Sequence, residues 1–279
     1  MTRTAKLALA LAVLALLTTG VGCNKLRARD QLNKGVQAYK AAKYETAIEH
    51  FKNAVELDPK LVNARLYLAT AYANQVIPNV DSPENVQMAQ QAIDEFQKVL
   101  EQNPTTEAKV NSMKGIASLY FNTKKLDQAR EWHKKVLEVD PQDPETYYSI
   151  GVIDWTKAYA PRMAERAKLG LKPTEPLNVK KPDEKKACET LRSENQEAVQ
   201  EGIDMLQKAL QYRPDYDDAM AYLNLMYRER ADIQCDDPAA QQADLQTADE
   251  WVKKTMDTKR MKAEKAAQGQ GGIVLEENK

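Results

Sequence analysis

The side chains with the most reactive chemistry in this chain are three cysteines and two histidines. A metal or catalytic centre needs convergent ligands, or a nucleophile beside a base, and no such spacing occurs around Cys188, Cys235, His50 or His133. His133 falls at an apolar helix position and should pack there, whereas His50 should be exposed. Glycine-rich phosphate loops are also absent. We therefore predict that the protein is not an enzyme and that it holds no cofactor and no metal.

Cys23 follows a segment with the pattern of an export signal. Arg3 and Lys6 precede an apolar run over residues 7–17, and small residues lead from this run to the cysteine. The run is too short for a stable membrane span and is typical of a secretory signal. Residues 1–22 resemble a bacterial lipoprotein signal peptide, although Gly20 stands where leucine is usual. The resemblance implies cleavage and acylation of Cys23, for example with palmitate; the alternative is ordinary cleavage nearby, with Cys23 lost.

The residue after the cysteine bears on the destination of an acylated protein. Asn24 stands where the inner-membrane retention signal would have aspartate. The resemblance therefore implies an outer membrane lipoprotein that faces the periplasm, or the extracytoplasmic face of the cell membrane where there is only one membrane. Residues 23–27 are expected to be the lipidated N-terminus and a short tether, since more than one acyl chain anchors a protein durably.

Paired helical patterns fill most of the remaining chain. In residues 35–60, apolar and small residues recur at helical spacing in two segments, which is typical of two amphipathic helices joined by a turn. Pro59 ends the second segment, because a proline disfavours helical geometry in the residue before it. Similar runs end at Pro104, Pro141 and Pro214.

This arrangement resembles the tetratricopeptide repeat (TPR), a helix–turn–helix unit of about 34 residues. Gly35, Ala47, Phe51 and Pro59 stand at the intervals at which the family places its glycine, alanine, aromatic residue and proline. The resemblance implies an all-α TPR solenoid over residues 28–267, with a C-terminal capping helix and a mobile tail over 268–279. About five repeats are expected, near residues 28–61, 62–106, 110–143, 144–216 and 217–260.

The fourth repeat contains a long insertion, over residues 157–196. Residues 161–169 have a helical pattern, residues 171–183 are rich in proline, and a helix can then run to Arg213. We expect an extended helical hairpin at one edge of the array. Cys188 lies in this insertion and Cys235 in that of repeat five, and neighbouring repeats would place them side by side. In an exported protein this predicts a Cys188–Cys235 disulfide; two unpaired thiols or intermolecular pairing are the alternatives.

The charge balance argues against one class of partner. The chain has 40 basic and 41 acidic residues and a net charge of −1. A balance of this kind provides no field that would attract nucleic acid. We therefore expect protein or peptide partners, contact with a membrane through the N-terminal lipid, and no nucleic acid.

The first helix of each repeat lines a concave groove in TPR proteins. Carried over by position, the resemblance implies a partner-binding groove formed by Tyr39, Lys40, Asn74, Lys114, Phe121, Asn122, Tyr148, Trp155 and Arg228. The aromatic and amide side chains in this set suit an extended peptide or a partner helix. The alternative is that Tyr148 and Trp155 pack beneath the insertion. A lysine–asparagine carboxylate clamp is not expected, because Ser118 stands where asparagine would be needed.

Together these patterns predict an envelope lipoprotein that acts as a protein-interaction scaffold or adaptor, with a role in envelope, pilus or secretion assembly. A periplasmic module for small ligands is the main alternative, because the hairpin could partly roof the groove. A self-assembling scaffold is a further possibility. Mutation of Trp155 would separate the first two, since only a ligand-binding module would lose its ligand and keep its protein partners.

Overall fold

The structure is a computed structural model that describes residues 23–270, with side chains up to residue 267. The described residues form helices joined by turns and loops, so the predicted all-α fold is confirmed. Residues 1–22, which are predicted to be a signal peptide, and residues 271–279 lie outside the described residues. Within the described residues, no helix is long and apolar enough to cross a membrane. The chain divides into two compact units, Met1–Val139 and Asp140–Lys279, and each is considered by itself.

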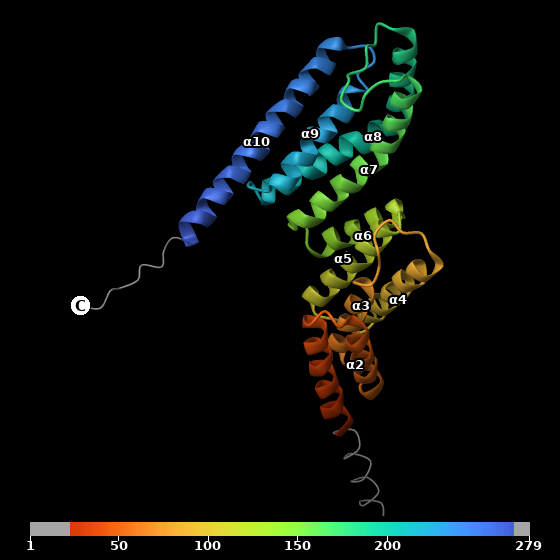
Figure 1. Ribbon diagram of the computed structural model, residues 1–279, viewed down its shortest axis with the longest axis vertical. Helices are drawn as coiled ribbons and strands as arrows, with labels where there is room; N and C mark the ends of the chain where they lie inside the picture. The colour runs from red at the N-terminus through yellow and green to blue at the C-terminus, as the bar shows by residue number, and fades with distance from the viewer. Residues whose placement is uncertain (1–22, 271–279) are drawn as a thin grey trace, which may run out of the picture. The chain divides into compact units, whose positions relative to one another are not determined.

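The first unit contains three helical pairs (Figure 1). Its first helix covers residues 23–40, so the expected tether of residues 23–27 is helical and continuous with the first repeat. The remaining helices are α2 (Tyr44–Leu57), α3 (Val62–Ala73), α4 (Pro83–Leu100), α5 (Thr106–Asn122) and α6 (Leu126–Val139). Each packs on the next, from α2 to α6, and α3 also contacts α5. This is the packing of a helical solenoid, in which each repeat buries its neighbour's apolar face.

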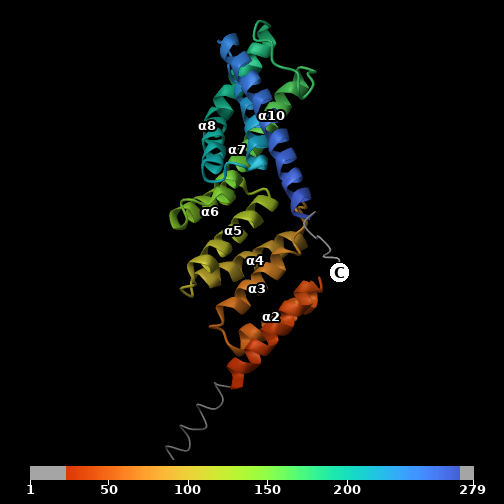
Figure 2. The same ribbon diagram turned by 90° about the vertical axis from the view of Figure 1, so that its left-hand side faces the viewer.

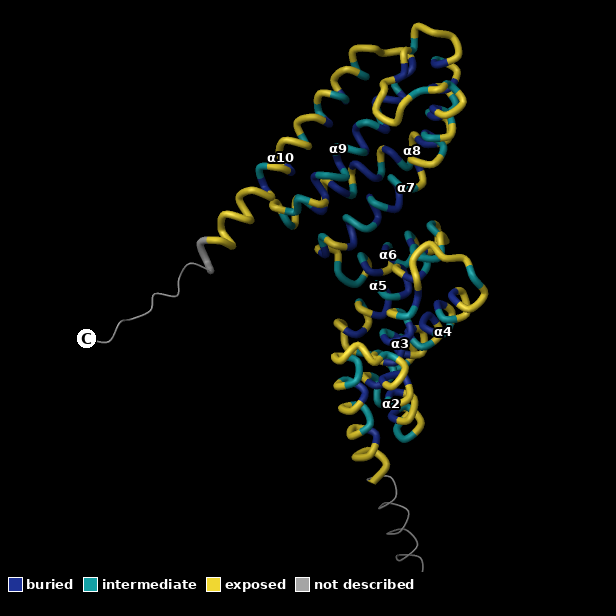
Figure 3. Tube along the Cα trace, viewed as in Figure 1, coloured by how far each residue is buried: buried dark blue, intermediate teal, exposed yellow. Residues whose placement is uncertain are grey.

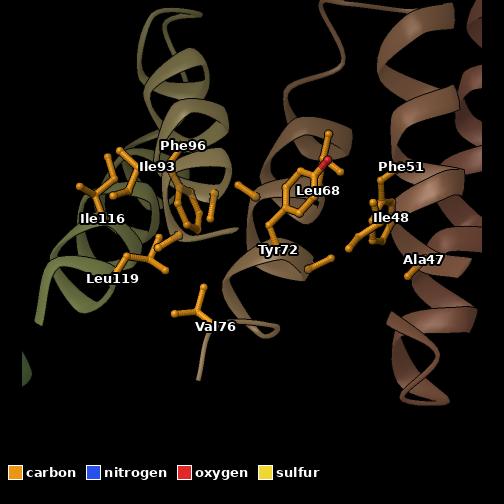
Figure 4. Close-up of a cluster of buried hydrophobic side chains, with 14 residues drawn as sticks. Ala47, Ile48, Phe51, Leu68, Tyr72, Val76, Ile93, Phe96, Ile116 and Leu119 are labelled. Carbon is orange, nitrogen blue, oxygen red and sulfur yellow. The ribbon is translucent and has the colours of Figure 1, made fainter. Parts of the chain in front are cut away.

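A continuous hydrophobic core runs through the first unit (Figure 4). Phe51 on α2 and Phe96 on α4 are almost fully buried, and they occupy equivalent places in successive repeats. Phe51 also stacks on Tyr67 of the next repeat, with ring centroids 5.6 Å apart. Large side chains thus fill the spaces between helix pairs, as the repeat pattern predicts.

The described part of the second unit contains the helices α7 (Pro144–Lys168), α8 (Pro182–Tyr212), α9 (Asp217–Ala231) and α10 (Pro238–Gln270), of which α7, α8 and α10 are long. In Figures 1 and 2 they lie side by side, with α7 against α8 and α9 against α10. Residues 268–270, expected to belong to the tail, continue α10. Residues 259–267 of α10 are exposed, as Figure 3 shows.

The insertion forms a helical hairpin by lengthening α7 and α8. Helix α7 continues to Lys168 and ends where Gly170 adopts a positive φ of 68°. The amide of Leu171 then donates to the carbonyl of Arg166 at 3.0 Å, which completes a glycine C-cap. Residues 169–181 connect the helices, and Leu177 in this loop is 2% exposed. The insertion is therefore an ordered part of the second unit.

A close helix crossing explains one of the small residues in the repeat pattern. A Cβ atom placed on Gly151 of α7 would lie 2.5 Å from Cγ of Leu206 and 3.2 Å from the carbonyl oxygen of Gly202, both on α8. Real Cβ atoms do not approach other atoms this closely, so glycine lets α7 and α8 make contact along the hairpin.

Candidate binding groove

The first unit has a groove between α3 and α5, the first helices of its second and third repeats. It encloses a cavity of about 790 Å³. Its lining combines apolar side chains such as Leu66, Phe96 and Leu119 with polar residues, which are Asn63, Thr70, Asn74, Thr105, Glu107, Asn111, Ser118 and Asn122. This is the face on which the repeat pattern places the concave groove.

Two matched pairs of asparagines mark this groove. Asn63 and Asn74 stand on or just after α3, and Asn111 and Asn122 occupy the corresponding places on α5. Eleven residues correspond to almost three whole turns of an α-helix, so both members of a pair share one face. Asn63, Asn74 and Asn111 are exposed. The groove therefore offers primary amides, which can both donate and accept hydrogen bonds.

The first repeat contributes to the groove through Tyr39. The side-chain amide of Asn74 donates a short hydrogen bond to the Tyr39 hydroxyl, and the ring of Tyr39 meets that of Tyr44 edge-on at 5.4 Å. On the other side, the backbone N–H of Asn79 donates a hydrogen bond to the backbone carbonyl of Asn122 at 2.9 Å. These bonds hold Asn74 and the end of α5 in place.

The structure brings together only part of the predicted residue set. Asn74 and Asn122 line the cavity, and Tyr39 accepts a hydrogen bond from Asn74 beside it. Lys114 and Phe121 are half-buried and do not line the cavity. Lys40 is exposed at the end of the first helix. A single residue step turns a helical side chain by about 100°, so neighbouring positions on one helix face different directions.

The second unit carries an aromatic strip between α7 and α9. The strip consists of Tyr148, Trp155 and Tyr159 on α7, with Tyr216 and Tyr222 from α9 and the turn before it. Tyr148 contacts Tyr216 and Tyr222, with ring centroids 5.0 and 5.6 Å apart. Trp155 contacts Tyr222 at 5.4 Å and Tyr159 at 4.8 Å. The rings are partly exposed, so Tyr148 and Trp155 are not sealed beneath the insertion.

The hydroxyls of Tyr148, Tyr216 and Tyr222 stay protonated at physiological pH, because burial raises the pKa of each. Burial, followed by the proximity of Tyr222 and Asp218, raises the pKa of Tyr148. Burial also raises the pKa of Tyr216 to about 12. The hydroxyls are therefore neutral hydrogen-bond donors and acceptors. Arg228, the last predicted groove residue, is half-buried and pairs with Asp249 at 2.6 Å, so its charge is already neutralised.

The predicted disulfide between Cys188 and Cys235 is present. It joins α8 to the segment between α9 and α10, and both cysteines are buried. Its Cα–Cα distance is 5.5 Å. The bond ties the beginning of α8, next to the hairpin loop, to the segment between α9 and α10.

A buried charge cluster accompanies the disulfide. Arg162 and Arg166 project from the inserted part of α7 towards Asp232 at the end of α9, with N–O distances of 2.6 and 2.5 Å. Glu229 lies 3.5 Å from Arg162. Arg162 and Arg166 also donate to carbonyls of the hairpin loop, which are those of Lys172, Pro173 and Glu175. The cluster therefore fastens the loop to α9.

Glu229 is the member of this cluster with the most perturbed acidity. It is 2% exposed, and burial raises its pKa to about 7, although Arg162 opposes the shift. The sequence interpretation missed this cluster. Its signal was the placement of Arg162 and Arg166 four residues apart, in register with the apolar face of α7.

The two histidines differ in their surroundings. No group of metal-ligating side chains occurs within residues 23–270. His133 is buried, as predicted, whereas His50 is half-buried and its ring Nδ1 lies 2.7 Å from Gln31 Oε1. His50 was expected to be exposed, and packing against the first helix accounts for the difference.

Comparisons with known proteins identify the repeats. Two tetratricopeptide repeat family models match residues 63–106 and 115–143. A search of curated proteins finds no match. Among solved structures, MamA 41-end from Desulfovibrio magneticus RS-1 superimposes with a TM-score of 0.54 at 17% identity, covering 84% of this chain and 96% of that one. YrrB, described as "a TPR protein with an unusual peptide-binding site", gives a TM-score of 0.51 at 14% identity, covering 88% and 97%.

These similarities agree with the helix pairs and their packing. At such low identity the solved structures report on the fold alone, and the family models locate repeats at the helix pairs α3–α4 and α5–α6. The chain is a tetratricopeptide repeat protein with an all-α solenoid fold.

Proposed function

We propose that the protein is a membrane-anchored scaffold of the bacterial envelope, and that it binds an extended segment of a partner protein in the groove between α3 and α5. The observation that carries this proposal is the repeated set of amides in that groove. TPR proteins as a family support protein–protein interaction. The description of YrrB as having a peptide-binding site is consistent with a peptide as the occupant.

The dimensions of the groove suit a short extended segment. Asn63 and Asn74 are eleven residues apart on a helix, which corresponds to about 16 Å. An extended chain rises about 3.3 Å per residue, so about five residues would cross the groove. Amides at both ends can pair with backbone N–H and C=O groups, which favours backbone recognition over recognition of a particular side chain. Apolar positions such as Leu66 would contact alternate side chains of the partner.

The anchor rests on the sequence signal. Residues 1–22 have the pattern of a lipoprotein signal, and acylation of Cys23 would place the first repeat next to the membrane, because residues 23–40 form one helix. Cys23 is exposed, as an acylated residue must be. Asn24 favours the outer membrane, facing the periplasm. A scaffold in that position suits the assembly of envelope, pilus or secretion complexes.

Site-specific photocrosslinking in intact cells tests the groove. A photoreactive amino acid at Thr70 lies in the groove, and the matched control carries it at Asn53, an exposed residue of α2 outside the groove. We expect a defined protein adduct from Thr70 and not from Asn53. Asn63→Ala/Asn111→Ala should reduce the adduct severalfold, and Asn53→Ala should not.

Two other outcomes would reject the proposed groove. Equal adducts from Thr70 and Asn53 would place the partner elsewhere. The small-ligand alternative would be established by two results together. Thr70 would give no protein adduct, and a small molecule would co-purify with the wild type but not with Asn63→Ala/Asn111→Ala.

Metabolic labelling with an alkyne fatty acid tests the anchor. The wild-type chain should incorporate label and fractionate with the outer membrane, whereas Cys23→Ala should be unlabelled. Labelling that persists in Cys23→Ala, or a wild type without label, would refute acylation at this residue.

A further inference from the structure

The aromatic strip of the second unit is a continuous surface that the proposed amide groove does not use. Its rings follow one another in the order Tyr216, Tyr148, Tyr222, Trp155 and Tyr159, with successive centroids 5.0, 5.6, 5.4 and 4.8 Å apart. Most of these rings are half-buried, and Tyr159 is 38% exposed. Half-exposed aromatic rings supply contact area with little loss of conformational entropy on binding.

The spacing of the strip matches one type of backbone. Tyr148 and Trp155 are seven residues apart on α7, which corresponds to about 10.5 Å along the helix. One turn of a polyproline II helix covers three residues and about 9.3 Å. Tyr222 lies between the two rings and contacts both. The Tyr148 and Trp155 rings are therefore separated by about one turn of a polyproline II helix. One turn of an α-helical ligand would cover only about 5.4 Å, about half of this separation.

An unpaired carboxylate stands at the edge of this strip. Asp218, in the first turn of α9, is close enough to influence the electrostatics of Tyr148, Tyr216 and Tyr222. It is exposed, and it has no salt-bridge partner within residues 23–270. Its neighbour Asp217, by contrast, pairs with Lys262 at 2.6 Å. Asp218 is therefore free to pair with a cation on a bound segment.

We infer that the aromatic strip binds a proline-rich segment of a partner protein that carries an arginine or lysine beside the prolines. Prolines would pack on the exposed surfaces of the Tyr148, Tyr222 and Trp155 rings, and the basic side chain would pair with Asp218. A polyproline II helix is stiff before binding and exposes its carbonyl groups, so it loses little entropy and can accept hydrogen bonds from tyrosine hydroxyls.

This site is independent of the amide groove. All its residues belong to the second unit, whereas Asn63, Asn74, Asn111 and Asn122 belong to the first. The two surfaces also differ in chemistry: amides suit an extended chain with free backbone N–H groups, and a proline-rich segment has few such groups. One of the two proposals can therefore fail without the other.

A tryptophan reporter tests the inference in the full chain. The chain has three tryptophans, so Trp132→Phe/Trp251→Phe leaves Trp155 as the only indole. The probe is the peptide Arg-Ala-Pro-Pro-Ala-Pro-Pro-Ala-Pro-Pro. One control peptide replaces every proline with glycine, and another replaces the arginine with glutamine. We expect a saturable change in Trp155 emission with the probe and at least tenfold weaker binding of the glycine peptide.

Two substitutions in the same background assign the binding to the strip. Tyr222→Leu should lower the affinity for the probe peptide at least tenfold, because it removes a central aromatic contact. Asp218→Asn should lower the affinity for the probe peptide about threefold to fivefold at low salt, which is the range of an exposed ion pair. The same substitution should not change the affinity for the glutamine peptide. Asn111→Ala, in the amide groove, is the matched control and should bind the probe as the parent does.

Several results would overturn the inference. These are the absence of a saturable change with the probe, equal binding of the glycine peptide, and wild-type affinity in Tyr222→Leu. A response to an amphipathic helical peptide or to anionic vesicles, with none to the probe, would assign the strip to another kind of partner. If Tyr222→Leu lowers helicity by circular dichroism, Asp218→Asn decides the matter, because that side chain is exposed.

Discussion

The buried carboxyl of Glu229 predicts an unusual pH dependence for the stability of the second unit. Burial raises its pKa from 4.5 to about 7 in the folded chain. Between these values the folded state binds more protons than the unfolded state, so stability falls as pH rises. A shift of this size corresponds to about 3 kcal/mol, an order-of-magnitude figure. The contribution of protonated Glu229 to the stability of the folded state is fully present below pH 4.5 and is lost as pH rises through 7.

The test compares the wild type with Glu229→Gln, which cannot ionise. Urea unfolding would be followed by fluorescence in a Trp132→Phe background, so that both remaining tryptophans, Trp155 and Trp251, lie in the second unit. We expect the unfolding free energy of the glutamine variant relative to the wild type to increase by about 2–3 kcal/mol between pH 5 and pH 8. Glu197→Gln, an exposed site on α8, should show no such trend.

The sign of the trend separates this effect from that of other carboxyls. Hydrogen bonding to Lys262 lowers the pKa of Asp217, and hydrogen bonds from Lys181 and Asn178 overcome burial to lower that of Glu184. Both groups therefore stabilise the fold above their unfolded pKa values and lose that effect in acid, in wild type and variant alike. Parallel stability curves for the wild type and Glu229→Gln from pH 5 to pH 8 would refute the reasoning.

Three further predictions concern stability. Replacing both disulfide cysteines (Cys188→Ser/Cys235→Ser) should lower the unfolding free energy of the second unit by about 4 kcal/mol, because the bond closes a loop with a sequence separation of 47; urea unfolding without reductant measures this, and equal stability of both chains would contradict it. Gly151→Ala should cost about 1–3 kcal/mol through its clash with Leu206, and a double variant with Leu206→Ala should cost less than the two single changes added together; strict additivity would argue against the clash. Ala42→Gly should stabilise the first unit by about 0.5–1 kcal/mol and raise its melting temperature, because Ala42 has a φ of 56°. Ala47→Gly, inside α2, should lower the melting temperature, and a lower melting temperature in both variants would count against backbone strain at Ala42.

The groove residues show how far repeat register extends. Register placed Asn74, Asn122, Tyr148 and Trp155 on the first helices of their repeats, because helical periodicity assigns residues to faces. It did not identify Asn63 or Asn111, which lie near the starts of α3 and α5 and join the groove only when these helices pack together. Tyr216 and Tyr222 were missed for the same reason: their ring contacts depend on the distance between α7 and α9.

The sequence by itself determined the paired-helix repeat architecture, because it follows from local periodicity, and it predicted the pairing of Cys188 with Cys235 from the register of adjacent repeats. Only the tertiary structure decided which polar groups became neighbours. Arg162 and Asp232 are 70 residues apart in the chain and meet at 2.6 Å. Such contacts depend on helix lengths, crossing geometry and loop closure together, and these arise from packing that no local pattern encodes.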